Sequence, residues 1–235
     1  DIVECIPADS YTKLRGSSAS ETGTGAIVAM DDFSTQTAGA VTGKTPLLAS
    51  AGLFSGAGDA DDFQVDTTNQ RIYRSAVSDS AANNGRYLRC GSGTLAATTI
   101  TADIFHPGTG SSTDRFGLML RYVDTSNWLM CVYDGSGTSL SLVKRVAGAE
   151  TTLATCGGDF RAWRTLTVGA DTSGNVLIYE CDKGGTPAPM ILTLADSTLA
   201  TAGAIASGGY GIYDATTTSA RPRYCDNGSV SSLAT

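Results

Sequence analysis

Paired carboxylates are the first chemistry to consider in this chain, because glycoside hydrolysis needs two carboxyl groups, one on each side of the scissile bond. Glu180 and Asp182 are two residues apart in an extended segment, so both side chains lie on one face of the expected strand. That strand ends directly before Lys183-Gly184-Gly185, where solvated charges are typical. We therefore predict no catalytic role for this pair.

The single histidine limits nucleophilic catalysis, because Ser–His–Asp and Cys–His mechanisms would both depend on it. His106 stands in the sequence Phe105-His106-Pro107-Gly108, which is typical of a strand that runs into a turn. The sequence contains no Gly-x-Ser-x-Gly motif for a nucleophile turn. These observations predict that the chain is not an enzyme and has no catalytic residue.

Acidic residues offer two candidate sites for Ca²⁺, a hard cation that prefers several oxygen ligands. One is the loop that contains Asp59 and Asp61, and the other is formed by Asp32 and Asp226 if the two terminal strands pair. Neither follows the spacing of an EF-hand loop, and aspartates that cap backbone amides in turns explain both. Calcium is the one metal to consider, and we expect no other cofactor.

Saccharide binding needs exposed aromatic rings beside polar groups, because a ring offers a large apolar face. Trp128, Tyr133 and Tyr210 are the candidate residues for such a platform. Large aromatic side chains more often pack in a core, and the alternation around Trp128 and Trp163 indicates that at least one of the two tryptophans is buried.

Composition excludes several classes of partner. Only 17% of the 235 residues are charged and the formal net charge is −7, whereas a nucleic-acid or anionic-membrane surface needs clustered lysine and arginine. No apolar run approaches the length of a membrane span. We expect neither nucleic acid nor membrane as a partner.

The six cysteines do not indicate a zinc site, because no two of them stand in a Cys-x-x-Cys pair. Several lie within apolar strand patterns, where a free cysteine behaves as a small buried hydrophobic residue. An even number also permits three disulfides in an exported protein. We expect mostly free thiols.

The elements that would position these residues are short strands. Residues 1–28 are small, polar and unpatterned, which indicates an N-terminal arm before a single domain over residues 29–235. Strands at intervals of about 8–12 residues, separated by turns rich in Gly, Asn, Asp and Ser, predict an all-β antiparallel sandwich. The expected strands with the clearest pattern are 98–105, 116–122, 128–133, 139–146, 150–154, 163–168, 176–181, 208–213 and 221–230.

A set of short motifs in a fixed order resembles the concanavalin A-like, or laminin-G-like, jelly roll found in phage structural and bacterial surface proteins. This resemblance covers roughly residues 30–232 and implies a two-sheet jelly roll in which the first and last strands are neighbours. Cys225 and Gly228 stand where that family usually has aromatic residues. The motifs are Asp32-Phe33, Gly117-Leu118-Met119-Leu120-Arg121, Asp124-x-x-Asn127-Trp128, Leu142-Val143-Lys144, Thr152-Leu153-Ala154, Trp163-x-x-Leu166-x-Val168, Gly211-Ile212-Tyr213 and Asp226-Asn227.

The resemblance and the composition lead us to expect a non-enzymatic structural module of a phage virion, such as a capsid decoration, fibre or tail protein. Its partners would be other virion or surface proteins, contacted through residues 1–28, and a homo-oligomer is expected. The alternative is a carbohydrate-binding or adhesin module of an exported bacterial protein, located outside the cell or on its surface, with cell-surface glycans as partners. A glycoside hydrolase is the third hypothesis, and it lacks an evident carboxylate pair.

Overall fold

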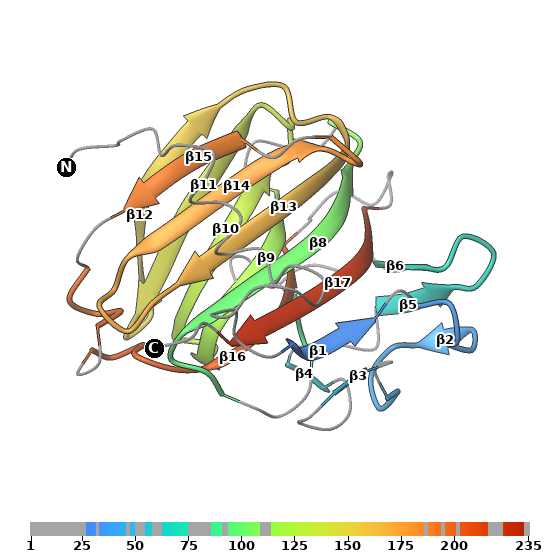
Figure 1. Cartoon of the computed structure of the whole chain (residues 1–235), viewed down its shortest axis with the longest axis horizontal. Helices are drawn as coiled ribbons and strands as arrows, with labels where there is room; N and C mark the ends of the chain where they lie inside the picture. The colour runs from blue at the N-terminus through green and yellow to red at the C-terminus, as the bar shows by residue number, and fades with distance from the viewer. Residues whose placement is uncertain are drawn as a thin grey trace, which may run out of the picture.

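Two antiparallel β-sheets face each other across an apolar core in the computed structural model (Figure 1). The structure describes residues 27–31, 33–45, 48–49, 55–57, 63–74, 86–90, 94–108, 114–185, 188–193, 196–200, 203–215 and 223–232. Over these residues the secondary structure is β-strand and turn, and no helix in them could span a membrane. The expected all-β sandwich is confirmed.

The larger sheet contains ten of the described strands. Eight form a continuous path in the order β15 (Ala188–Thr193), β14 (Val176–Asp182), β13 (Ala162–Ala170), β8 (Thr98–His106), β17 (Tyr224–Ser232), β6 (Arg71–Arg74), β5 (Phe63–Asp66) and β2 (Gly39–Ala40). The other two are β1 (Ile27–Asp31), which pairs with β17, and β3 (Leu48–Ala49), which pairs with β1.

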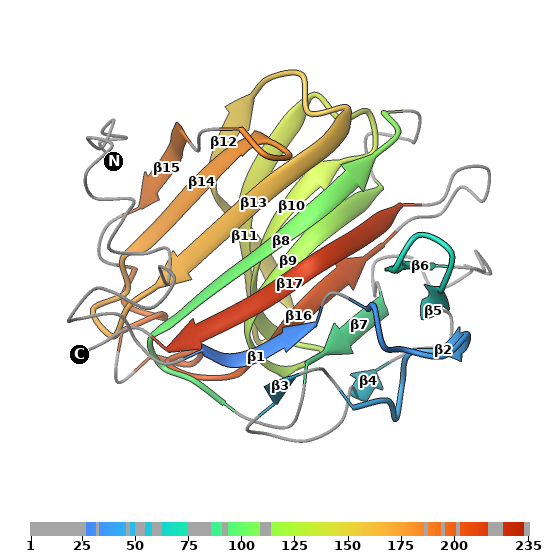
Figure 2. The ribbon, with the colours of Figure 1, turned by 45° about the vertical axis from the view of Figure 1, so that its right-hand side comes forward.

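The smaller sheet contains seven described strands and covers one face of the larger sheet (Figure 2). Their order is β12 (Ala149–Gly157), β11 (Ser139–Val146), β10 (Asn127–Asp134), β9 (Arg115–Asp124), β16 (Gly209–Asp214), β7 (Arg86–Arg89) and β4 (Ser55–Ala57). Alternate apolar residues of both sheets point into the space between them, among them Ile104, Leu118 and Leu166, each fully buried.

The strands expected from sequence between residues 98 and 181 are all present within a few residues of the predicted bounds. Aspartates close the turns between them, as at Asp134, whose carboxylate accepts hydrogen bonds from the Thr138 and Ser139 amides. The first and last strands are neighbours, with Asp31 opposite Gly228, as the resemblance implied. β1 begins at Ile27, inside the expected arm, and the rest of that arm lies outside the described residues.

Arg121 forms hydrogen bonds with three loops at one end of the sandwich. Its guanidinium donates hydrogen bonds to the carbonyl oxygens of Leu199, Ile205, Ala96 and Asp171, and its side chain is almost fully buried. The backbone φ of Arg121 is 49°, in the left-handed region.

We expect the Arg121→Met substitution to lower the free energy of unfolding by about 3 kcal/mol or more, because it removes a buried donor shared by four carbonyl oxygens, two of which belong to the buried residues Leu199 and Ile205. Urea unfolding measures this loss. Arg115→Met on the same strand is the matched control, since the Arg115–Glu150 ion pair is about one-third exposed and its removal costs less than about 1 kcal/mol. Equal losses in the two variants would contradict this role of Arg121.

Candidate functional site

Four aromatic side chains form a continuous row across four neighbouring strands of the larger sheet, which we call the aromatic row. Tyr73 of β6 is opposite Tyr224 of β17, Tyr224 is opposite Phe105 of β8, and Phe105 is opposite Trp163 of β13. The ring centroids of these successive pairs are 6.1, 5.8 and 5.6 Å apart. All four side chains are half-buried.

The two-residue period of the strands places the aromatic row on the outer face of the larger sheet. In three of these strands the neighbouring residue points the opposite way: Ile72, Cys225 and Ile104 are buried in the core between the sheets. The row is therefore a surface feature set by strand register, with its rings held by neighbouring strands on both sides.

Two cationic side chains border the aromatic row. The Arg71 guanidinium carbon lies 3.5 Å from the centre of the Tyr224 ring, and Lys183 Nζ lies 4.5 Å from that of Trp163. Both distances are within the range of a cation–π interaction. These two cations therefore contact Tyr224 and Trp163, and all four rings of the row remain partly exposed.

A polar strip runs beside the aromatic row, two residues further along each strand. Asp103 and Asp226 are opposite each other on β8 and β17, and Lys183 Nζ lies 3.3 Å from Asp103 Oδ2 and 3.0 Å from Asp226 Oδ2. Thr165 donates a hydrogen bond of 2.6 Å to Asp103 Oδ1. Burial lowers the pKa of Lys183, but the two carboxylates outweigh it and leave that pKa raised.

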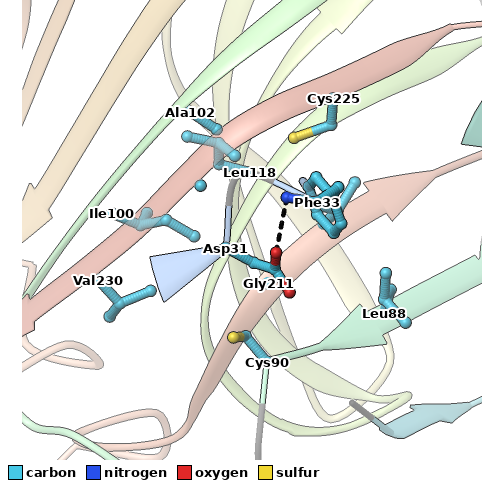
Figure 3. Close-up of a pocket in the computed structure, with 12 residues that line it drawn as sticks. Asp31, Phe33, Leu88, Cys90, Ile100, Ala102, Leu118, Gly211, Cys225 and Val230 are labelled. Atoms are coloured by element: carbon cyan, nitrogen blue, oxygen red, sulfur yellow. Dashed lines mark hydrogen bonds between the residues drawn. The ribbon is translucent and has the colours of Figure 1, made fainter. Parts of the chain in front are cut away.

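A small cavity lies between the sheets beside β1 and β17 (Figure 3). Its volume is about 40 Å³, room for a few water molecules and too little for a sugar ring. The carboxylate of Asp31 at its wall accepts hydrogen bonds from the Phe33 amide (2.6 Å) and the Gln36 side chain (2.7 Å). The lining is otherwise apolar: Phe33, Leu88, Cys90, Ile100, Ala102, Leu118, Gly211, Ile212, Cys225, Gly228 and Val230.

The cysteines of this cavity are unreactive. Burial raises the pKa of the Cys90 thiol to about 12 and also raises that of Cys225, so both remain protonated at neutral pH and are poor nucleophiles or metal ligands. Among the described residues, Cys90, Cys131, Cys156, Cys181 and Cys225 form no disulfide with one another, and Cys5 lies outside the described residues. The expectation of mostly free thiols stays a prediction.

The three aromatic residues proposed from sequence as a saccharide platform are buried. Trp128 is 1% exposed, Tyr133 is fully buried and Tyr210 is 2% exposed. Tyr133 and Tyr210 pack in the core between the sheets, and Trp128 packs on the outer side of the smaller sheet with apolar neighbours such as Met130. The prediction of an exposed saccharide platform at these positions was therefore wrong, because β10 and β16 are buried on both faces.

The calcium candidates are only partly described. Asp32, Asp59 and Asp61 lie outside the described residues. Asp226 forms an ion pair with Lys183, so the lysine ammonium occupies the position that a cation would take beside this carboxylate. Within the described ranges, no three acidic, histidine or cysteine side chains come together as metal ligands.

Arg164 binds both carboxylates of the candidate hydrolytic pair. It donates hydrogen bonds to Glu180, one of them 2.9 Å long from NH2 to Oε2, and another to Asp182. Glu180 is 3% exposed, whereas Asp182 is at the surface. The solvated charges expected at this strand end are found for Asp182 but not for Glu180, whose buried carboxylate has its charge compensated by the shared guanidinium.

His106 ends β8 and is fully buried. Its Nδ1 accepts a hydrogen bond of 3.0 Å from the Gly108 amide, and Arg223 Nε lies 3.3 Å from its Nε2. Burial and then the positive charge of Arg223 lower the pKa of His106 to about 4, so the ring is neutral at pH 7. The side chain packs near Tyr133 and has no partner suited to activate a nucleophile among those contacts.

Sequence reasoning missed most of the aromatic row. Tyr73 and Tyr224 were not considered, Phe105 was noted only as part of a strand, and Trp163 was considered without being selected. The available signal was the alternation in each strand, which predicts that an aromatic beside a buried isoleucine points outward. That signal does not tell which strands are neighbours.

No family model and no curated protein sequence matches this chain. Its fold is similar to that of a mutant of the GH43 protein BlXynB from Bacillus licheniformis, at 15% sequence identity and a TM-score of 0.61. The match covers 87% of this chain and 39% of that protein, so this chain spans about two-fifths of its length.

Two proteins of similar extent also share the fold. The carbohydrate-binding module CBM66 from Bacillus subtilis has a TM-score of 0.55 at 15% identity, with 76% of this chain and 95% of that module covered. A protein of unknown function from Shewanella oneidensis has a TM-score of 0.54 at 15% identity, with 98% and 96% covered. These likenesses establish the fold alone. None of the three is described as a virion component, so the expected phage role gains no support from them.

The stability of the protein should fall as the pH is lowered from about 6.5 to about 4. The folded pKa of His106 is about 4 and the ordinary value is 6.5, so the unfolded chain binds the proton first and is favoured in this interval. The loss between pH 7 and pH 4.5 is about 2–3 kcal/mol. Urea unfolding at the two pH values measures it.

His106→Gln should remove most of this pH dependence, because His106 is the single histidine of the chain. Carboxylates with lowered pKa values, such as Asp66 and Asp196, lose their contribution at lower pH, below about 4. The contributions of these carboxylates are the same in the wild type and in His106→Gln, so they cancel when the two pH dependences are compared. The same slope in both proteins would show that His106 is not the responsible group.

Proposed function

We propose that this chain is a carbohydrate-binding module and that the aromatic row is its binding face. The observation that carries the proposal is the alignment of Tyr73, Tyr224, Phe105 and Trp163 in register across four neighbouring strands. A sugar ring presents an apolar face of C–H groups that packs against an aromatic ring, and its hydroxyl groups need polar partners nearby. The outer face of the larger sheet combines both kinds of group.

The polar strip supplies the hydrogen-bonding groups. Asp103 and Asp226 can accept hydrogen bonds from sugar hydroxyls, while Lys183 can donate to them. The side chains of Lys183 and Asp226 are 38% and 14% exposed, so a ligand on the neighbouring rings would reach them. The likeness to CBM66, nearly all of which is covered by the match, supports the same function.

The proposal includes binding without hydrolysis. The Glu180–Asp182 pair is held by Arg164, and Asp103 and Asp226 are both ion-paired with the ammonium of Lys183, so both carboxylate pairs are already engaged by a cation. A module of this kind would work in an exported or cell-surface protein, where polysaccharides are met.

The first ligands to test are plant cell-wall polysaccharides. The names of similar structures refer to a xylan β-1,4-xylosidase, a Bacteroides ovatus xyloglucan PUL GH43B protein and a GH43 enzyme with endo-xylanase and exo-arabinofuranosidase activity. Those proteins share 10–14% identity with this chain. They guide the choice of a panel containing arabinoxylan, xyloglucan and arabinan, to be screened by affinity gel electrophoresis and then by calorimetry.

Trp163→Ala should weaken binding of the best polysaccharide by about tenfold or more, because it removes the largest ring of the row and a truncated aromatic anchor typically costs 2 kcal/mol or more. Trp163→Phe keeps a ring on the same face and should retain most of the affinity. Calorimetry of the three proteins measures the difference, and urea unfolding checks that each variant is folded.

Val123→Ala is the control away from the row, since Val123 is 48% exposed at the end of β9 in the other sheet. It should bind as the wild type does. Equal affinities for wild type and a folded Trp163→Ala variant would contradict the assignment of the binding face. Failure of the wild type to bind any polysaccharide of a broad panel would contradict the proposed function itself.

A further inference from the structure

Lys183 holds an unusual position at the end of the aromatic row, because three electron-rich groups converge on its ammonium. Asp226 Oδ2 is 3.0 Å away, Asp103 Oδ2 is 3.3 Å away, and the centre of the Trp163 ring is at 4.5 Å. The two carboxylates come from different strands and the ring from a third. The ammonium thus joins the polar strip to the aromatic row.

The register of β8 and β17 creates the need for this cation. It places Asp103 directly opposite Asp226, and like charges opposite each other on paired strands are destabilising. Thr165 contributes a neutral hydrogen bond to Asp103 but no charge. A positive charge between the carboxylates is what allows both to remain side by side on this face.

The backbone fixes where Lys183 stands. The turn after β14 contains Gly184 at a φ of 79°, and the Gly185 amide donates a hydrogen bond of 2.7 Å to the Asp182 carbonyl. The Lys183 amide itself donates to the Trp163 carbonyl at 3.1 Å. The turn is therefore bonded to the strand that carries Trp163, and the lysine side chain reaches back over the sheet.

We propose that Lys183 takes the role of a metal ion in the binding face, so that glycan binding by the wild type needs no divalent cation and favours uncharged saccharides. This inference rests on the proposed function. A divalent cation beside two carboxylates would order them and offer itself to sugar hydroxyls. The ammonium orders both carboxylates in the same way, and its side chain is 38% exposed, so a sugar hydroxyl beside Trp163 can approach it.

The charges explain the preference for uncharged saccharides. Lys183 carries one positive charge against the two negative charges of Asp103 and Asp226, while the Arg71 guanidinium is paired with Asp66, and the whole chain has a formal charge of −7. A uronic acid carboxylate on this face would meet repulsion from both aspartates, whereas a hydroxyl group would meet acceptors.

The test compares binding of arabinoxylan, as a largely neutral probe, and of polygalacturonate, as an acidic probe, in EDTA and in CaCl₂. The wild type should bind arabinoxylan equally in both media and polygalacturonate at least about tenfold more weakly. Lys183→Met should lose about tenfold or more in affinity for arabinoxylan in EDTA. Lys183→Arg keeps the charge and should lose less.

Lys144→Met is the matched control, because Lys144 forms an ion pair of 2.6 Å with Asp196 but belongs to β11 of the other sheet. It should bind as the wild type does. Loss of wild-type binding in EDTA, preference for polygalacturonate, or wild-type affinity in a folded Lys183→Met variant would each overturn this inference while leaving glycan binding intact.

A second readout needs no glycan. Terbium(III) is a calcium substitute whose luminescence is excited through a nearby tryptophan, and Trp163 is adjacent to the site. Lys183→Met should show saturable terbium luminescence that CaCl₂ reverses and that the added change Asp226→Asn abolishes, while the wild type should show none from this site. Absence of luminescence in Lys183→Met would overturn the metal-like role of Lys183, whatever the outcome with polysaccharides.

Discussion

The guanidinium of Arg121 is the interaction on which the arrangement of the sheets depends. It binds the carbonyl oxygens of Ala96, just before β8, and of Asp171, just after β13, together with two carbonyls of the segment that leads to β16. Arg121 belongs to the smaller sheet, so one buried charge connects it to two strands of the larger sheet. Those are the strands that carry Phe105 and Trp163.

This connection shows what the Gly-Leu-Met-Leu-Arg motif contributes. The arginine satisfies carbonyl groups in loops that have no partner strand, and buried carbonyls without a donor are costly. Gly208 lies so close to the Arg121 backbone that a Cβ there would come within 2.4 Å of it, so the loop can approach only with a glycine. A recognisable motif thus corresponds to a packing requirement and carries no ligand chemistry itself.

The strands could be predicted from sequence because their signals are local. Alternation and Asp-containing turns act over a few residues, and they located β8 to β14 within a few residues of their bounds. The aromatic row could not be predicted in the same way, since Tyr73, Phe105, Trp163 and Tyr224 become neighbours only through the pairing of β6, β17, β8 and β13. Pairing depends on long-range contacts that no short pattern records.

The wrong prediction of a saccharide platform at Trp128, Tyr133 and Tyr210 also arose because a local pattern does not record what packs on each face of a strand. The alternation of apolar and polar residues along a strand distinguishes buried from exposed positions only when one face of that strand is in contact with solvent. In β10 the core side chains Leu129, Cys131 and Tyr133 alternate with Trp128, Met130 and Val132, which are buried on the other side. An aromatic residue in such a strand has no exposed position to occupy, so its type alone suggested a function that its surroundings exclude.

The same sandwich occurs as about two-fifths of a GH43 protein and as almost the whole of a carbohydrate-binding module, so the fold does not decide between catalysis and binding. The binding role that we propose rests on the side chains of the outer face instead. A paired sheet holds aromatic rings with little rotational freedom, and rings that are ordered before a ligand arrives cost less conformational entropy on binding. General acid catalysis needs a carboxyl group that can give up and regain a proton, whereas the two carboxylates of this face are ion-paired with one lysine. Ordered rings and carboxylates held by an ion pair are the properties that support the binding role proposed above.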